Sequence, residues 1–157
     1  MFLVKIIKGI GRITSWIPFL LVILISCDVF MRYLLNYSSA SFYELEWHLF
    51  AVIFLLGSVH TLHQNEHVRV DVFYNRLSDR KKIIIDLVGD LVFLVPFSIV
   101  VFYSSLPFVE DSFMILESSP DPGGLPFRFI IKSMIPITFL LLGAQGVLRI
   151  YQNFKKL

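Results

Sequence analysis

The chain has 157 residues, of which 56% are hydrophobic and 17% are charged, with a net charge of +2. Soluble domains have about 45–50% apolar and about 25% charged residues, so this composition excludes a soluble enzyme, a disordered chain and a nucleic-acid-binding domain. The single cysteine excludes an internal disulfide bond and a zinc site built on cysteines. The mean hydropathy of +0.74 predicts a small all-α protein that crosses a membrane several times.

Four apolar stretches are long enough to cross about 30 Å of hydrocarbon as helices. They cover residues 13–35, 42–63, 82–108 and 127–151, and we expect a single membrane domain over residues 1–157. Pro18 falls in a first helical turn, whereas Pro96 and Pro136 are expected to kink the third and fourth helices. The basic start and the apolar run that follows are typical of a signal peptide, but no small-residue cleavage site comes after them. We therefore expect the first helix to be retained.

Basic residues gather on one side of these segments. Eleven of the 14 Lys and Arg residues lie at the two ends of the chain or between the second and third segments. By the positive-inside rule, this places both termini in the cytoplasm and makes residues 109–126 a periplasmic loop. Lys5, Lys8 and Arg12 share one helical face opposite apolar residues, which predicts a short amphipathic helix at the membrane interface. Residues 68–77 are a second candidate for such a helix.

Ionisable residues inside membrane segments are costly, so each is a candidate for function. Asp28 and Arg32 are four residues apart and can pair on one helical face, either as a site for a transported charge or, as we prefer, as a structural pair. Glu44 and Glu46 start the second segment, where the helix dipole favours negative charge. Glu46 lies deeper, and we expect it to bond to another helix or subunit. No nucleophile accompanies these carboxylates, so we expect no catalytic residues and no enzyme activity.

The four histidines all lie between residues 48 and 67. His60, His63 and His67 share a helical face that suggests a metal site, and His48 with a second histidine suggests haem. A bis-histidine haem needs ligands from two facing helices, however, and the other three segments contain no histidine. We therefore expect no metal and no cofactor, with a haem-binding electron-transfer subunit as the alternative function. A self-contained exporter would need a polar path at the membrane midplane, which these helix centres lack.

The segment between the third and fourth stretches has an unusual composition. Residues 118–126 contain three prolines, which restrict the backbone, and two glycines, which permit turns with positive φ. This pattern predicts a shaped loop that is either a rigid connector or a docking surface, and both interpretations stay open. The docking candidates are Glu117, Asp121, Gly123 and Gly124.

Several motifs together resemble the small four-helix membrane subunit of tripartite ATP-independent periplasmic (TRAP) transporters. In chain order they are residues 28–33 (Asp-Val-Phe-Met-Arg-Tyr), 44–50, 54–57, 66–73 (Glu-His-Val-Arg-Val-Asp-Val-Phe), 119–126, 132–136 and 145–146. The loop motif Ser-Pro-Asp-Pro-Gly-Gly-Leu-Pro is similar to that of a mannitol/chloroaromatic-type branch. The resemblance spans almost the whole chain, although many members have adjacent glutamates where this chain has Glu44-Leu-Glu46.

The resemblance implies a role as one part of a complex in the bacterial inner membrane. A large multi-helix subunit would carry the transport domain and the sodium sites, and a periplasmic binding protein would deliver the substrate, usually an organic acid. This chain would brace the large subunit within the lipid bilayer and extend the docking surface. The resemblance supplies no catalytic residues. The motif and interface candidates are Asp28, Arg32, Glu44, Glu46, His67, Arg69 and Asp71.

Overall fold

The computed structural model describes residues 2–64, 74 and 77–156. Within them the chain forms α1 (Phe2–Thr14), α2 (Ile17–Leu34), α3 (Ala40–Gln64), α5 (Asp79–Gly89), α6 (Val95–Met114) and α7 (Phe129–Phe154). A π-helical turn, η1 (Asp90–Leu94), joins α5 to α6. In this described part, four helical segments are long and apolar enough to cross a membrane, which confirms the predicted all-α membrane fold.

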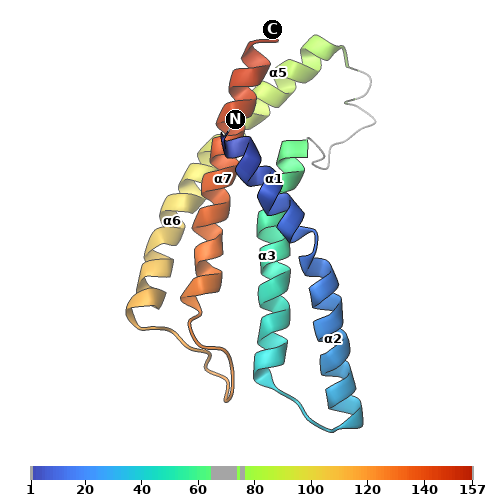
Figure 1. Ribbon diagram of the computed structural model, residues 1–157. Coiled ribbons are helices and arrows are strands. Elements are labelled where there is room, and N and C mark those ends of the chain that lie inside the picture. The colour runs from blue at the N-terminus through green and yellow to red at the C-terminus, as the bar shows by residue number, and fades with distance from the viewer. Residues whose placement is uncertain (1, 65–73, 75–76, 157) are drawn as a thin grey trace.

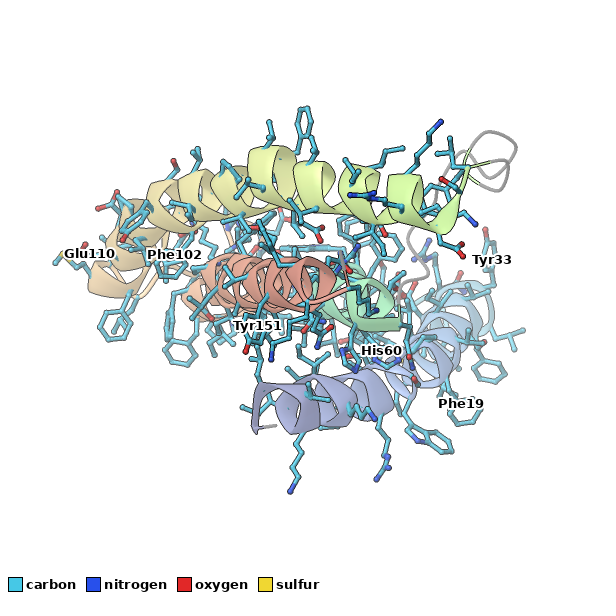
Figure 2. The ribbon with its side chains drawn as sticks, turned by 90° about the horizontal axis from the view of Figure 1, so that it is seen from above. Phe19, Tyr33, His60, Phe102, Glu110 and Tyr151 are labelled. Atoms are coloured by element: carbon cyan, nitrogen blue, oxygen red, sulfur yellow. The ribbon has the colours of Figure 1, made fainter. Side chains whose placement is uncertain are left out.

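The helices form three layers when they are viewed from the end of the bundle (Figure 2). α3 and α7 lie in the middle, α1 and α2 on one side, and α5 and α6 on the other. Both termini lie at one end of the molecule, and the α2–α3 and α6–α7 loops lie at the other (Figure 1). Phe19 and Tyr33 point outward from α2 and are 60% and 75% exposed. The apolar excess therefore covers the outside of the bundle, as suits helices that face lipid or other helices.

The predicted amphipathic helix and the first predicted membrane segment form two separate helices, α1 and α2. α1 ends at Thr14, and α2 begins at Ile17 with Pro18 in its first turn, as expected from the sequence. Proline is tolerated there because the first amides of a helix have no partner within the helix. α1 then crosses α3 near the end that carries the termini (Figure 1).

One face of α1 packs on α3, and the other is exposed. Ile7 is fully buried and belongs to the small apolar core with Val59, Leu62 and Leu142. The basic face formed by Lys5, Lys8 and Arg12 is exposed, which confirms the predicted amphipathic helix. Its position at a membrane interface remains a prediction.

The third membrane segment contains an irregular turn directly before its proline. Pro96 lies in the first turn of α6, immediately after the π-helical turn η1. A proline inside a helix removes one backbone hydrogen bond and crowds the carbonyl four residues earlier, and a π turn relieves that crowding by widening the backbone. The structure thus has a wider turn directly before Pro96, and the kink expected there stays a prediction. α7 continues through Pro136 from Phe129 to Phe154 without interruption.

Small side chains lie where α6 contacts α7. Ser98, Ser105 and Ser112 are buried at intervals of seven residues along α6. On α7, a Cβ added to Gly143 would lie 3.3 Å from the Cβ of Ser98, so the two backbones approach closely there. Small residues at helix contacts allow such approach in membranes, and a seven-residue repeat is typical of left-handed helix pairs. We call Ser98, Ser105 and Ser112 the serine seam.

Candidate functional site

The loop between α6 and α7 (residues 115–128, the α6–α7 loop) is closed by its own backbone. The amide of Ser119 donates to the carbonyl of Leu125 over 3.0 Å, and the amide of Arg128 donates to the carbonyl of Glu117 over 2.8 Å. These bonds pair the incoming and outgoing chains, so the loop has a defined shape, as the prolines and glycines predict. The shape alone leaves both interpretations of the loop, connector and docking surface, open.

Glu44 attaches this loop to the first turns of α3. The hydroxyl of Ser119 donates to one carboxylate oxygen of Glu44, and the amide of Leu125 donates to the other over 2.6 Å. Glu44 is 4% exposed, so both of its acceptor oxygens are satisfied within the fold. From the sequence, Glu44 was expected to favour the N-terminus of its own helix and was a motif and interface candidate, but no partner in the loop was predicted for it. Its long-range partners were missed because Ser119 and Leu125 lie in a segment without helical periodicity.

The two glycines of the loop serve different purposes. Gly123 has a φ of +77°, a conformation that favours glycine, as predicted. Gly124 is not among the described residues with positive φ, but its amide closes the turn by donating to the carbonyl of Asp121 over 2.9 Å. A Cβ at Gly124 would lie 2.5 Å from the Oγ of Ser119 and 3.0 Å from a carboxylate oxygen of Glu44. Gly124 is therefore required by the close approach of the loop to Glu44.

The acidic docking candidates differ in their availability. Glu117 accepts a hydrogen bond from the ammonium of Lys132, and this bond lowers the pKa of Glu117 below its usual value of 4.5. The ammonium also lies 4.1 Å from the centroid of the Phe108 ring. Asp121, in contrast, is exposed on the surface of the loop. Glu117 thus ties the loop to α7, whereas the carboxylate of Asp121 is exposed, and its role in docking stays a prediction.

Three charged side chains gather between α2 and α3 near the same end of the bundle. The guanidinium of Arg32 donates to Asp28, which confirms the predicted pair, and Asp28 is 4% exposed. The charges of both residues act on Glu46 of α3. One carboxylate oxygen of Glu46 is buried and has no hydrogen-bond partner within the described residues. The expected bond from Glu46 to another subunit therefore stays a prediction.

The described histidines all belong to α3. His63 accepts a hydrogen bond from the Gln145 amide over 3.2 Å, and His60 packs against Gly11 of α1. The described part of the chain contains no group of three or more His, Cys, Asp or Glu residues that could hold a metal ion. The haem alternative gains no support, because these residues come from one helix. His67, Arg69, Asp71 and most of the candidate interfacial segment 68–77 lie outside the described residues.

A further ion pair was missed by sequence reasoning. The carboxylate of Asp90 lies 3.1 Å from the Nε atom of Arg149, and both side chains are largely buried. Asp90 was assigned only to the start of the third segment. The pair could have been predicted from the opposite charges of Asp90 and Arg149, which lie in the third and fourth segments near the same side of the membrane. Burial makes such a pair sensitive to the loss of either partner.

Most of the chain matches one known family. Residues 21–156 match the family described as "Tripartite ATP-independent periplasmic transporters, DctQ component". The matched range begins in α2 and ends just beyond α7, so it includes three of the four membrane-spanning candidates in full and residues 21–34 of the first. No curated protein sequence matches the chain. The match does not separate branches within the family, so the mannitol/chloroaromatic branch stays a prediction.

Proposed function

The chain belongs to the DctQ component family of TRAP transporters, and from this premise we propose that it scaffolds a sodium-coupled importer of organic acids. Members of this family act with a large membrane component, DctM, and a binding protein, in the inner membrane. Sodium coupling and an organic-acid substrate are what the motif resemblance implies. The excess of Lys and Arg at both ends supports cytoplasmic termini.

A scaffold role suits the distribution of polar groups in the bundle. The buried polar residues of α6 and α7 form helix contacts, and the large apolar side chains of α2 face outward. Secondary transporters place substrate sites at the midplane, where polar groups converge on broken helices. Among the described residues, the charged clusters lie near the helix ends instead. The exposed apolar face of α2 then provides contact area for a membrane partner or for lipid.

The proposal that the α6–α7 loop receives the binding protein rests on its attachment to α3. Glu44 fixes the loop through Ser119 and Leu125, and the hydroxyl of Ser41 also donates to the carbonyl of Gly123. A loop fixed in this way keeps one shape before it meets a partner, which reduces the entropy lost on docking. Asp121 is exposed at that loop and supplies a charge that a basic partner residue can recognise.

Reconstituted uptake tests this function. Proteoliposomes that contain this chain and DctM, with loaded binding protein outside, should take up substrate only when a sodium gradient is present. Omission of this chain should abolish uptake or reduce it strongly. Full uptake by DctM and the binding protein alone would contradict the scaffold proposal.

The docking role needs a separate variant. Asp121→Lys should raise the concentration of binding protein needed for half-maximal uptake, while the amount of DctM that co-purifies stays unchanged. The matched control is Glu110→Lys, since Glu110 is an exposed carboxylate at the end of α6 outside the loop. Uptake kinetics equal to wild type in Asp121→Lys would favour a simple connector.

A further inference from the structure

The basic side chains of α1 have no counter-charge within the described part of the chain. The ion pairs between described residues use basic side chains of α2, α5 and α7. Lys5, Lys8 and Arg12 of α1 are all exposed, and none of them forms an ion pair with a described carboxylate. The 13 residues of α1 include no acidic residue. We call Lys5, Lys8 and Arg12 the basic row.

Packing against the bundle determines the direction in which the basic row points. Ile7 and Thr14 are buried, and a Cβ added to Gly11 would lie 2.1 Å from Nδ1 of His60 on α3. At about 100° per residue, Ile7, Gly11 and Thr14 lie within about 60° of one another and form one contact face. A rotation of α1 about its own axis would break this contact. The fold therefore holds the basic row on the outside.

α1 has a third face, which is apolar and exposed. It carries Ile6 and Ile13, and Ile13 is 68% exposed. By the same count, the contact face, the basic row and this isoleucine pair lie about 120° apart around the helix. Trp16 follows directly after α1 and is 67% exposed, and tryptophan is enriched at the boundary between hydrocarbon and water. The surface of α1 outside its contact face thus combines an apolar side with a basic side.

An anionic phospholipid matches both exposed faces of α1. Its acyl chains suit the isoleucine pair, and its phosphodiester accepts charge-assisted hydrogen bonds from lysine and arginine. A protein partner is a poorer match, because lysine is depleted in protein interfaces and two of the three cations are lysines. α1 also lies at the outer edge of the bundle (Figure 2), where lipid can approach it.

We propose that α1 is a binding surface for anionic phospholipids in the leaflet at the end of the bundle that carries the termini. The steps from Lys5 to Lys8 and from Lys8 to Arg12 rise by about 5 and 6 Å, so one phosphate fits between the two cations of each step. The acyl chains lie against Ile6 and Ile13. This surface is independent of the transported substrate and of the binding-protein dock, and it needs no other subunit.

Quenching of Trp16 fluorescence by brominated lipids measures the lipid beside α1. The chain has two tryptophans, so Trp47→Phe gives a parent in which Trp16 is the only indole. The full-length parent is reconstituted in mixtures of phosphatidylcholine and phosphatidylglycerol, with bromine on the acyl chains of one lipid and then of the other. The two series together give the local ratio of the lipids. Trp16 follows Arg12 by four residues and therefore reports on that end of the basic row.

We expect phosphatidylglycerol to be enriched beside Trp16. Each basic residue near an anionic surface strengthens binding by about fivefold, so three of them should enrich this lipid at least fivefold over the bulk at low salt. High salt should reduce the enrichment, because ions screen exposed charges. A local ratio equal to the bulk ratio at low salt would overturn the proposal.

Removal of the basic row tests its role. Lys5→Gln, Lys8→Gln and Arg12→Gln, combined in the parent, should return the local ratio to the bulk value. A melting temperature close to that of the parent establishes that this variant is folded. Arg12→Gln alone should reduce the enrichment several-fold, and it keeps the test available if the triple variant does not fold. Enrichment equal to that of the parent in a folded variant would overturn the proposal.

A matched variant separates the basic row from net charge. Arg80→Gln, Lys81→Gln and Lys155→Gln together remove the same charge from exposed residues of α5 and the C-cap of α7. α5 lies in the outer layer opposite α1 (Figure 2), so this variant should keep the enrichment. Equal loss in both triple variants would overturn the proposal, since net charge would then explain it. Loss of DctM co-purification without the basic row, together with no lipid enrichment in the parent, would instead make α1 a protein contact.

Discussion

The carboxylate of Glu44 and the hydroxyl of Ser119, which stand 75 positions apart in the chain, are joined by a hydrogen bond in which the hydroxyl donates. The second oxygen of the same carboxylate receives the amide of Leu125. One side chain on α3 therefore bonds to both the incoming and the outgoing part of the α6–α7 loop. Ser41 of α3 and Lys132 of α7 add further contacts to the loop, at Gly123 and Glu117.

Replacement of Glu44 by glutamine should loosen the loop. The glutamine amide has one acceptor oxygen where the carboxylate has two, so one of the two long-range bonds is lost and the other no longer involves a charge. We expect the amide of Leu125 to exchange with solvent several-fold faster, measured by hydrogen exchange in nanodiscs. Glu110→Gln is the control, since Glu110 is exposed outside the loop. Equal protection of Leu125 in wild type and Glu44→Gln would mean that the loop is held by its own backbone bonds.

Gly11 should not tolerate alanine. A Cβ at Gly11 would lie 2.1 Å from Nδ1 of His60, so α1 or the imidazole must move. Overpacking of this kind typically costs about 1–3 kcal/mol. Thermal unfolding in detergent and limited proteolysis of α1 measure the effect. Gly9→Ala is the matched control because a Cβ there meets nothing within 4 Å, and alanine should even favour the helix. Similar melting temperatures for the two variants would contradict the tight contact between α1 and α3.

The contact between Glu117 and Lys132 should make stability depend on pH in the acid range. The bond lowers the pKa of Glu117 in the folded protein below its usual 4.5. A lowered pKa contributes stability that is fully present above the unfolded value and is lost as pH falls through the folded value. Arg128 also stabilises the charged form of this carboxylate. Melting temperature measured from pH 7 down to pH 3 should therefore fall, with the contribution of Glu117 disappearing below about pH 4.5.

Two variants test whether the contact between Glu117 and Lys132 causes this fall in melting temperature. Glu117→Gln should flatten part of the fall, because the glutamine does not titrate. Lys132→Gln should do the same from the other side of the pair. Asp121→Asn, which alters an exposed carboxylate of the same loop, should leave the profile as in wild type. An identical profile in wild type and Glu117→Gln would show that other carboxylates dominate.

The buried pair of Asp90 and Arg149 should show strong coupling. Removal of one partner from a buried ion pair costs about 3–5 kcal/mol, because the other charge stays in a poor environment. Asp90→Asn and Arg149→Met should each lower unfolding stability strongly, and the double variant should be less destabilised than the sum of the two. Denaturation in mixed micelles gives the free energy of unfolding of the wild type, the two single variants and the double variant. Additive losses would mean that the two side chains contribute independently.

Features that depend on local spacing could be predicted from the sequence. The pairing of Asp28 with Arg32 follows from a four-residue interval on one helix, and the basic face of α1 follows from helical periodicity. The four membrane segments follow from the lengths of apolar stretches, although their ends shift by several residues. The third extends over Asp79–Met114, beyond the expected 82–108, because polar residues continue the helix beyond the apolar core.

Features that depend on tertiary packing could not be predicted in the same way. Glu44 and Leu125 meet because the start of α3 and the α6–α7 loop lie at the same end of the bundle, which no interval in the sequence records. Gly124 lies in a turn, as its residue type indicates, but its close approach to Glu44 of another helix could not be predicted from the sequence. The serine seam, in contrast, was visible as a seven-residue repeat and could have been used to orient α6 toward α7.

The π-helical turn η1 sets the angular phase of the third membrane segment. The serine seam continued back by seven residues from Ser98 would reach Leu91, yet Leu91 is 52% exposed and the buried residue is Asp90. One extra residue in the turn shifts the phase by this single position, which equals about 100° of rotation in a regular helix. The turn thus rotates the preceding part of the segment relative to α6. As a result, both the carboxylate of Asp90 and the serine seam of α6 face α7. Deletion of one residue within Leu91–Leu94 would bring the two faces out of alignment and separate Asp90 from Arg149 without removing either charge.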